Sequence, residues 1–534
     1  MKKFAIAFGL LALPVTLFAQ SAISAYQLTG NDLRGTARFM SMGGAFTALG
    51  GDLSSLNQNP AGIGVYRSSD VGLSLDLNLA SSTVDDGIYN GTWKEKNTFF
   101  YCNNFGYIGA SSTGSSVMPF FQWGASYSRI ASFDRTYAGS YASLGTSMSN
   151  YIANFSNGYN PDDLGESSYY DPYWDSSADW LSILGFNSYI INPVGNTSQY
   201  NGLFQYGSPT TKPTTGNAEF MVRERGHIDE YSINFGGNFI DKIYWGLGFG
   251  ITEIDFKQDA FYDEELQNAR IASASGMGNR TEIGDAYYSL GNWKHVNGAG
   301  FNVKFGLIFK PINELRLGVA IHSPTWYNLT ERYNGDIYYN YTSKVGEGTA
   351  YSDDAYFDWK LRSPWRLTAG VATVLGGRFI ASVDYEMAAY DQMNVGDNYG
   401  PFNFVNNDIK AYYQTCNTIR AGLEFRLTPS FSARVGFAQS FSGVKSDVLD
   451  GYEYVSTSGT NPAYTFNRDT RYITAGLGYR YKWFYADLAY VNKHLSSTYQ
   501  PFSSFDDGTD WIYAPYSDFT TTENNIVLTL GVRF

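Results

Sequence analysis

The side chains that usually perform chemistry are few in this sequence, and they form no recognisable constellation. Its four histidines are isolated, and no two of them have the spacing of a metal site. His322 precedes Ser323, but no nearby acidic residue completes a catalytic triad. The two cysteines, Cys102 and Cys416, are too few to form a disulfide framework for a chain of 534 residues. The sequence therefore predicts no enzyme, no metal and no cofactor.

Charged residues, in contrast, occur in a regular pattern. Arg366 lies between Trp365 and Leu367, and Arg420 and Arg426 alternate with apolar residues along 419–427. Alternation with a period of two is typical of a β-strand that has one apolar and one polar face. The C-terminal segment 524–534 shows the same alternation and ends on Phe534.

Fourteen segments of this kind can be placed along the chain, and the connections between them alternate between very short turns and long polar stretches. This alternation of short and long connections is typical of an outer-membrane barrel with periplasmic turns and extracellular loops. A soluble β-sandwich has no reason to keep it. We therefore expect an all-β fold, a 14-stranded antiparallel transmembrane barrel. The expected strands are 69–81, 97–110, 118–133, 228–240, 243–258, 293–310, 313–330, 355–375, 377–393, 410–427, 430–442, 470–482, 484–496 and 524–534.

The first 19 residues have the features of a secretory signal peptide. Lys2 and Lys3 precede the apolar run 4–13, which is too short to span a membrane, and Ala19 offers a cleavage point. Removing this segment changes the formal net charge from −13 to −15. An acidic secreted chain does not suit nucleic-acid binding. Beyond the signal peptide no apolar run is long enough for a transmembrane helix.

The barrel interpretation assigns the charged residues to the lumen. An arginine on the lipid face of such a barrel costs about 2–4 kcal/mol near the midplane. We therefore expect Arg366, Arg420 and Arg426 to face inward, where they could contact a plug. We expect the barrel to span residues 67–534. Its longest polar stretch, 134–227, is expected to be an extracellular loop that folds over the mouth. An independent carbohydrate-binding module is the alternative for this stretch, and residues 178–186 within it predict a short helix.

The segment 20–66, before the first strand, predicts a plug, or hatch, inside the barrel. Residues 37–52 predict a short apolar helix with a small-residue face at Gly43 and Gly44, which would allow close packing in a crowded lumen. Asn59 then precedes Pro60, which predicts a turn because the residue before proline is disfavoured in the α region.

This segment resembles the hatch of the long-chain fatty-acid and aromatic-hydrocarbon transporters of Gram-negative outer membranes, the FadL/TodX or outer-membrane protein P1 family. That hatch is glycine-rich and ends in Asn-Pro-Ala, with an acidic residue seven positions before the asparagine. Here Asp52 precedes Asn59, Pro60, Ala61 and Gly62. The resemblance is specific over residues 37–64 and otherwise concerns architecture.

The resemblance implies a transporter of hydrophobic small molecules, such as long-chain fatty acids, which bind near the extracellular mouth and pass a hatch-gated, lateral route. It implies a gap in the wall at a kink of the third strand, for which Gly124 is the candidate. It also implies that Asn59 anchors the hatch, that Asp52 pairs with lumen arginines, and that the barrel works as a monomer.

Other interpretations stay open at this stage. A general diffusion porin or a surface adhesin barrel is the alternative function, and haem stays open as a ligand without a specific motif. The expected partners are a hydrophobic small molecule, outer-membrane lipid, and the barrel-insertion machinery that recognises an aromatic C-terminus such as Phe534.

Overall fold

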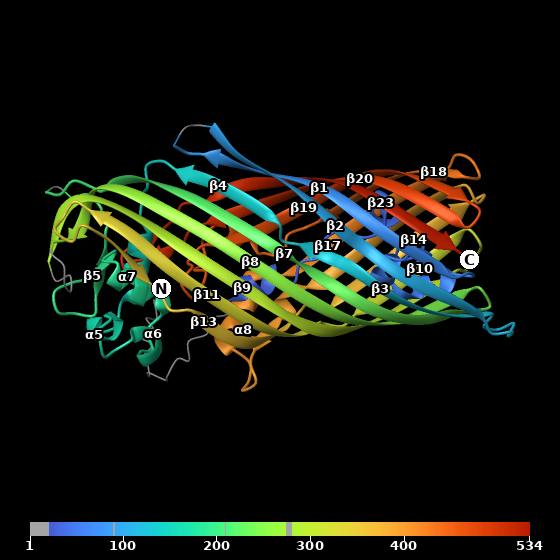
Figure 1. The fold of residues 1–534 in the computed structure, drawn as a ribbon, viewed down its shortest axis with the longest axis horizontal. Coiled ribbons are helices and arrows are strands. Elements are labelled where there is room, and N and C mark those ends of the chain that lie inside the picture. The colour runs from blue at the N-terminus through green and yellow to red at the C-terminus, as the bar shows by residue number, and fades with distance from the viewer. Residues whose placement is uncertain (1–20, 89–90, 209, 274–279) are drawn as a thin grey trace, which may run out of the picture.

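The chain folds into a closed antiparallel β-barrel. The structure, a computed structural model, describes residues 21–88, 91–208, 210–273 and 280–534; the predicted signal peptide lies outside these residues. Fourteen positions form the wall, and β1 closes it by pairing with both β2 and β23 (Figure 1). The wall strands are β1 (Asp70–Asp86), β2 (Gly91–Ser112), β3 (Phe120–Ser132), β7 (Thr215–Phe239), β8 (Ile243–Ala272), β9 (Thr281–Phe309), β10 (Leu315–His322), β11 (Trp326–Tyr341), β13 (Ala355–Arg362), β14 (Arg366–Leu375), β15 (Phe379–Ala389), β17 (Thr415–Arg426), β18 (Phe431–Ser440), β19 (Tyr464–Tyr481), β20 (Phe484–Gln500) and β23 (Ser517–Arg533).

Two neighbouring wall positions are interrupted, although the sequence predicts continuous strands there. β10 and β11 form one position and β13 and β14 the next, with Pro324 and Pro364 in the two breaks. Proline has no N–H to donate to a ladder, so a strand interior breaks where it occurs. The breaks face each other: the Ser363 amide donates to the Thr325 carbonyl at 3.1 Å, and the Thr325 amide donates to Ser363 Oγ at 2.8 Å.

The outer face of the wall is apolar and the inner face is polar, as the alternation predicts. On β23, Ile526, Leu528 and Leu530 are exposed, whereas Asn525 and Thr529 are buried. Buried acids such as Asp384 and Asp487 face inward in the same way. Apolar exposure outside and polar burial inside suit a barrel surrounded by lipid. The chain is therefore an outer-membrane β-barrel.

The apolar band covers only one part of the longest strands. On the outer face of β8, Phe249 and Ile251 are exposed, and the next outward positions are Glu253, Asp255 and Lys257. The chain above this level continues as strand, so β7, β8 and β9 extend far beyond the band (Figure 1). The sequence predicts strands 243–258 and 293–310 with a long polar connection, 259–292, between them, and that connection is wrong for most of its length because β8 and β9 continue through it. The turns at the other end are short, as in a barrel's periplasmic side.

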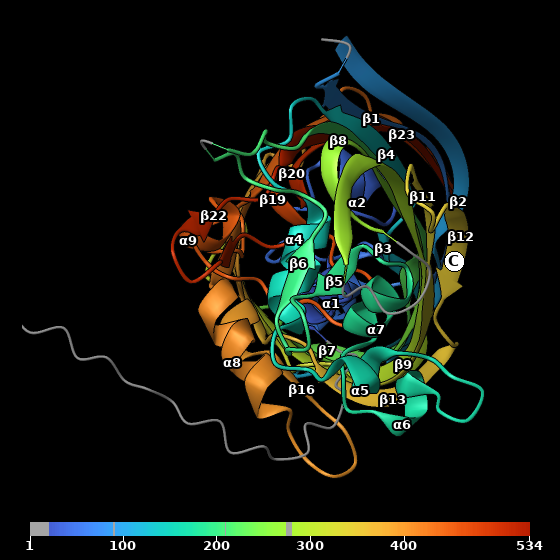
Figure 2. The same ribbon diagram turned by 90° about the vertical axis from the view of Figure 1, so that its left-hand side faces the viewer.

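Residues 142–208 and 210–214, here called the cap, fill the mouth of the barrel at the end where the long strands extend (Figure 2). Helix α7 (Trp180–Asn187) confirms the helix predicted over 178–186, and its apolar residues pack with Tyr288 and Ile337 of the strand extensions. A helix that is apolar on all sides is a buried helix. The other elements of the stretch 134–227 are β4 (Arg135–Tyr141), α4 (Met148–Ser156), α5 (Pro161–Leu164), α6 (Pro172–Asp175), β5 (Ile191–Pro193) and β6 (Tyr200–Gly202).

Shorter elements complete the loops. Helix α8 (Asn403–Tyr412) occupies residues where the sequence predicts the start of the strand 410–427, which instead begins at Thr415. No described helix is long and apolar enough to cross a membrane. The remaining loop elements are β12 (Glu347–Tyr351), η2 (Tyr390–Gln392), β16 (Asn394–Gly396), α9 (Ser446–Leu449), β21 (Phe505–Asp506) and β22 (Trp511–Ile512).

Candidate functional site

The N-terminal segment 21–66, here called the plug, lies inside the barrel, where Figure 2 shows α1 and α2 within the ring of strands. Its elements are α1 (Ala22–Gln27), α2 (Ala37–Ser41), α3 (Ser55–Gln58) and η1 (Pro60–Val65). Only Asn31 of these 46 residues is exposed. The helix predicted over 37–52 is wrong beyond Ser41, because Gly43 and Gly44 adopt left-handed φ angles of 62° and 72° that end it.

Inward-facing glycines of the wall form a seat for residues 36–66 of the plug. A Cβ on Gly306 would overlap the Asn59 side chain, and a Cβ on Gly246 would overlap the Pro60 backbone. Glycine is the residue that allows a backbone to approach this closely. The plug backbone therefore fits against the wall without intervening side chains. The wall glycines that contact the plug in this way are Gly236, Gly246, Gly306, Gly318, Gly422, Gly436 and Gly476.

Asn59 links two parts of the plug to the wall. Its Nδ2 donates to the Thr47 carbonyl at 2.6 Å and to the Leu307 carbonyl of β9 at 3.4 Å. Its Oδ1 accepts from the Ala61 amide at 3.0 Å, which caps the 3-10 turn that begins at Pro60. Gly62 carries a carbonyl that accepts from the Gly51 amide at 3.1 Å. The Asn-Pro-Ala-Gly motif therefore joins the plug loops to one another and to β9.

Asp52 does not contact the arginines that the resemblance suggests. Its Oδ1 accepts from Thr36 Oγ1 at 2.7 Å and from the Ser54 amide at 3.0 Å, so its partners lie within the plug. The cation with the largest influence on it is Arg38, also a plug residue. Asp52 therefore organises the plug itself, and the expectation that it pairs with lumen arginines is wrong.

The three predicted lumen arginines have three different positions. Arg366 donates to the Thr29 carbonyl of the plug at 3.0 Å and pairs with Glu386 at 3.0 Å. Arg420 pairs with the other oxygen of the same Glu386 at 2.9 Å. Arg426 is exposed at the end of β17. The lumen prediction is therefore wrong for Arg426, where the strand leaves the membrane.

Several plug contacts come from acids that sequence reasoning did not single out. Asp384 of β15 accepts from the Thr47 amide at 2.8 Å and from Gln58 Nε2 at 3.2 Å. Glu424 of β17 accepts from Arg38 of the plug at 2.9 Å. Both acids alternate with apolar residues in the sequence, and that alternation was the signal that could have identified them.

In residues 21–35 of the plug, α1 packs in an apolar cluster with residues such as Tyr413 and Val448, and the chain after it is held by charges. Arg34 pairs with Asp76 of β1 at 3.3 Å and Glu523 of β23 at 3.6 Å. Lys493 of β20 pairs with Asp32 and with the same Glu523, both at 2.9 Å. All five side chains are largely buried. This half of the plug thus sits in a network of alternating charges.

The ladder between β2 and β3 stops at Asn104 and Ser128, although β2 continues to Gly91 along β1. Beyond Ser128, toward the cap, β3 shifts register against β7 between Arg129 and Ala131. Gly124 lies in regular register with Ile108 and Asn234 on its two sides, so the irregularity is not at the glycine that the sequence suggests. Side chains cross the interruption, such as Tyr101, whose hydroxyl donates to Asp134 at 2.7 Å, and beyond it the Gly87 amide donates to the Ser140 carbonyl of β4 at 3.1 Å.

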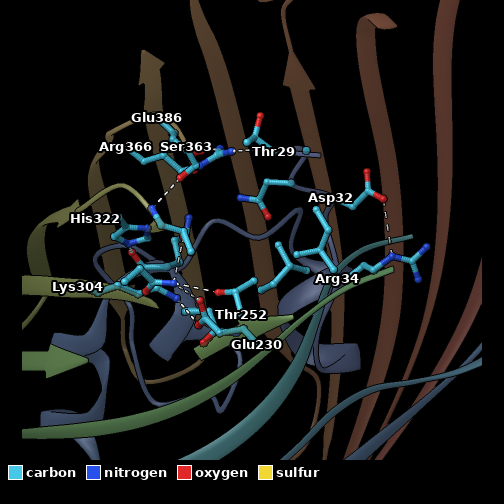
Figure 3. A pocket seen from close by; sticks show the side chains of 18 of the residues that line it. Thr29, Asp32, Arg34, Glu230, Thr252, Lys304, His322, Ser363, Arg366 and Glu386 are labelled. Atoms are coloured by element: carbon cyan, nitrogen blue, oxygen red, sulfur yellow. Dashed lines mark hydrogen bonds and ion pairs between the residues drawn. The ribbon is translucent and has the colours of Figure 1, made fainter. Parts of the chain in front are cut away.

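A cavity of about 130 Å³ lies between the plug and the wall beside this interruption (Figure 3). Its lining includes Arg129 and Ile130 from the shifted part of β3. Lys304 pairs with Glu230 across it, and His322 contacts the Gln58 carbonyl at 2.9 Å. Arg420 also lines it, and its Nη1 is buried without a hydrogen-bond partner among the described residues. Arg34 Nε and the amide oxygens of Asn57, Gln58 and Asn302 in the same lining are also without hydrogen-bond partners among these residues, so the cavity offers both unpaired donors and unpaired acceptors.

No protein-family model matches the sequence, and no curated protein matches it. Solved structures similar to the chain include the toluene transporter TodX of Pseudomonas putida, at 14% identity and a TM-score of 0.47 over 94% of this chain and 99% of that one. A FadL homologue of Pseudomonas aeruginosa matches at 12% identity and 0.49 over 94% and 99%. The toluene transporter TbuX of Ralstonia pickettii matches at 14% and 0.44 over 95% and 100%. These structures are of the kind that the segment from Asp52 to Gly62 resembles.

Proposed function

We propose that this barrel carries hydrophobic small molecules with an anionic head group, such as long-chain fatty acids, across the outer membrane. The ligand enters at the extracellular side, binds beside the plug and leaves sideways through the wall. The observation that carries the proposal is the end of the β2–β3 ladder at Asn104 and Ser128, next to a cavity and a filled lumen.

The filled lumen disfavours free diffusion of polar solutes. A diffusion porin has a water-filled channel through its centre. Here Asn59, Asp384 and the seat glycines fix the plug backbone against the wall, and the cap fills the mouth. A molecule that does not travel straight through the barrel needs another exit, which favours the lateral route.

The interrupted ladder supplies a place for that exit. Above Asn104, the ladder between the described parts of β2 and β3 has ended, so separating them there breaks side-chain contacts, up to the backbone bond from Gly87 to Ser140 of β4. The outward residues on the two sides of the ladder end, Phe105 in the paired part of β2 and Phe100 in the unpaired part, are apolar and exposed, so a ligand leaving here meets lipid. A hydrophobic molecule gains free energy in that transfer, about 0.8 kcal/mol for each CH₂ group removed from water.

Arg420 supplies the argument for the head group. Arg366 and Arg420 share the single carboxylate Glu386, which leaves Arg420 Nη1 directed at no other acceptor. A carboxylate in the cavity would form a charge-assisted hydrogen bond with it, a class of bond that contributes about 1.5–3 kcal/mol. Leu33 and Ile228 line the same cavity and suit the start of an acyl chain.

The test is uptake of a labelled long-chain fatty acid by cells that lack their own transporter and express this chain. We expect Arg420→Met to lower uptake at limiting concentration about tenfold, the factor that about 1.4 kcal/mol of lost binding gives. The matched control is Arg426→Met, because Arg426 is exposed outside the lumen and should leave uptake unchanged.

A neutral hydrocarbon separates head-group binding from transport itself. We expect Arg420→Met to leave toluene uptake unchanged if the barrel also admits it. Equal fatty-acid uptake by wild type and Arg420→Met would contradict the anionic head group. Absence of fatty-acid uptake from a barrel shown to be in the outer membrane would contradict the proposed ligand class and favour the porin or adhesin alternative.

A further inference from the structure

The end of the barrel with the short turns is basic, although the chain as a whole is acidic, with a formal net charge of −13. This turn end consists of the short turns, the two terminal residues of each strand that ends there, and residues 66–69, which lead into β1 (Figure 1, right). The structure describes all of these residues. Nine cationic side chains lie here against three acidic ones: Arg67, Lys242, Lys310, Arg316, Arg378, Arg426, Arg480, Lys482 and Arg533 against Asp70, Asp241 and Glu314. A local excess of one charge indicates a partner of the opposite sign.

Most of these cations have no acidic partner within the described part of the chain. Arg67 pairs with Asp241 at 2.7 Å, and Arg533 pairs with Asp70 at 2.8 Å. No ion pair between described residues includes any of the other seven cations. The basic excess is therefore largely available to an anion outside the chain.

Four of the seven lie in four separate turns. They are Lys242 between β7 and β8, Lys310 between β9 and β10, Arg378 between β14 and β15, and Lys482 between β19 and β20, here called the turn cations. Three of them are exposed, and Lys310 is partly exposed. They are spread around the wall, so a partner that meets all four must surround the barrel or cover its whole end.

The outer apolar band reaches the turn cations. Lys482 lies between Tyr481 and Trp483, which are both exposed, and its Nζ is 5.4 Å from the Tyr481 ring centroid. Tyrosine and tryptophan are typical of the boundary between hydrocarbon and lipid head groups. Exposed apolar residues also adjoin other turn cations, where Ile243 follows Lys242 and Phe309 precedes Lys310. One residue of extended chain spans about 3.5 Å, which places these cations at the depth of the lipid phosphates.

We propose that the turn cations bind the head groups of anionic phospholipids in the leaflet that surrounds the turn end. Phosphate oxygens accept charge-assisted hydrogen bonds from lysine and arginine. An anionic bilayer surface also attracts basic segments that lie beside it. Lipid surrounds a barrel on all sides, which suits cations spread over four turns. A soluble acidic protein suits them less well, because the apolar residues beside the cations face lipid.

This binding fixes the depth of the barrel in the membrane. Moving the turn end into the hydrocarbon would bury charged side chains, and moving it out would expose residues such as Trp483 and Ile243 to water. The two ends of the barrel therefore differ in their preferred surroundings, because the acidic excess of the chain lies outside the turn end.

The experiment measures how strongly spin-labelled lipids associate with the full-length barrel in phosphatidylcholine vesicles. Electron paramagnetic resonance separates labelled lipid at the protein surface from labelled lipid in the bulk bilayer, and so gives the association of phosphatidylglycerol relative to phosphatidylcholine. We expect the wild type to favour phosphatidylglycerol about threefold at low ionic strength, since only part of the surrounding lipid lies beside a cation. The combined variant Lys242→Gln, Lys310→Gln, Arg378→Gln and Lys482→Gln should show no preference. High salt should also remove the wild-type preference, because it screens exposed charges.

The matched control removes four exposed cations from the cap and the strand extensions, by Lys212→Gln, Arg223→Gln, Arg332→Gln and Lys344→Gln, and should keep the wild-type preference. If heat-modifiable gel mobility shows that the combined turn variant does not fold, Lys482→Gln alone replaces it and should lower the preference in part.

Three outcomes would overturn the proposal. The wild type has no preference, which would favour a soluble acidic protein as the partner; the turn variant keeps the full preference; or the control loses it equally. The readout is lipid association, so it does not depend on the proposed transport function.

Discussion

The two halves of the plug are held in the barrel by different physical means. Residues 36–66 lie with their backbone against wall glycines, so their position is set by shape. Within residues 21–35, α1 packs in an apolar cluster, and Asp32 and Arg34 pair with buried charges of β1, β20 and β23, so electrostatic pairing sets the position of the chain at Asp32 and Arg34. The interruption between β2 and β3 adjoins residues 21–35, here called the charged half of the plug, where Arg34 lies beside Tyr101 of β2.

The difference suggests that the two halves of the plug have different functions. Close packing has a single arrangement, because protein interiors are packed like crystals and a displaced backbone meets hard contacts. Paired charges can exchange partners when another ion arrives, provided that each charge stays paired. The glycine-seated half is therefore suited to sealing the lumen, and the charged half is suited to responding to an anionic ligand.

The largest expected loss of stability comes from removing the charge of Arg34 in the charged half of the plug. Arg34→Met leaves Asp76 and Glu523 without their plug partner, and breaking a buried ion pair on one side costs about 3–5 kcal/mol. Urea unfolding of the refolded barrel in detergent measures the loss, and Arg426→Met is the exposed control. A change below 1 kcal/mol would mean that the network does not hold the plug.

Adding volume to the glycine seat should have the next largest effect. Gly306→Ala places a Cβ against the Asn59 side chain, and overpacking of this kind costs about 1–3 kcal/mol. The free energy of unfolding and the protease protection of residues 36–66 are the measurements. Gly145→Ala is the control, because a Cβ there meets nothing within 4 Å. Unchanged protection in Gly306→Ala would show that shape does not fix this half.

Asn59→Ala should reduce stability less but change transport. The barrel should fold, because the seat glycines remain, while the carbonyls of Thr47 and Leu307 lose a donor. An unmet buried acceptor costs about 1–3 kcal/mol, and part of this is recovered by relaxation. Fatty-acid uptake and urea unfolding together test this, and a variant with wild-type uptake would exclude Asn59 as an anchor of the gate.

The barrel could be predicted from the sequence because lipid selects one face of every strand. Each membrane strand shows an apolar residue at every second position, as Ile526 to Phe534 do, so the number of strands and the short turns follow from local pattern. The extensions of β8 and β9 could not be predicted in this way. Outside the apolar band no lipid faces the strand, so Asp259 and Asp263 are as acceptable as Phe261 on the outer face.

The plug motif could be recognised, but its partners could not. Asn59 and Pro60 act locally, since the asparagine caps the turn that the proline starts. Asp384 and Glu424, in contrast, contact the plug only because the closed wall brings β15 and β17 to that side of the lumen. The stagger of strands around a barrel decides which inward residues meet the plug, and a single strand's sequence does not contain it.

The smallest effect tests the contact between the charged half and the wall interruption. The Tyr101 ring lies between Arg34 of the plug, at 5.0 Å from its centroid, and Arg129 of β3, at 5.1 Å. Cation–π contacts contribute about 0.5–2 kcal/mol each, so Tyr101→Leu should destabilise the barrel by roughly that amount. Tyr101→Phe keeps the ring and loses only the hydroxyl bond to Asp134. If the ring transmits plug movement to the interruption, Tyr101→Leu should change the rate of fatty-acid uptake more than Tyr101→Phe. Equal rates in the two variants, both different from wild type, would place the effect in the hydroxyl bond between Tyr101 and Asp134, and wild-type rates in both would exclude Tyr101 as the connection.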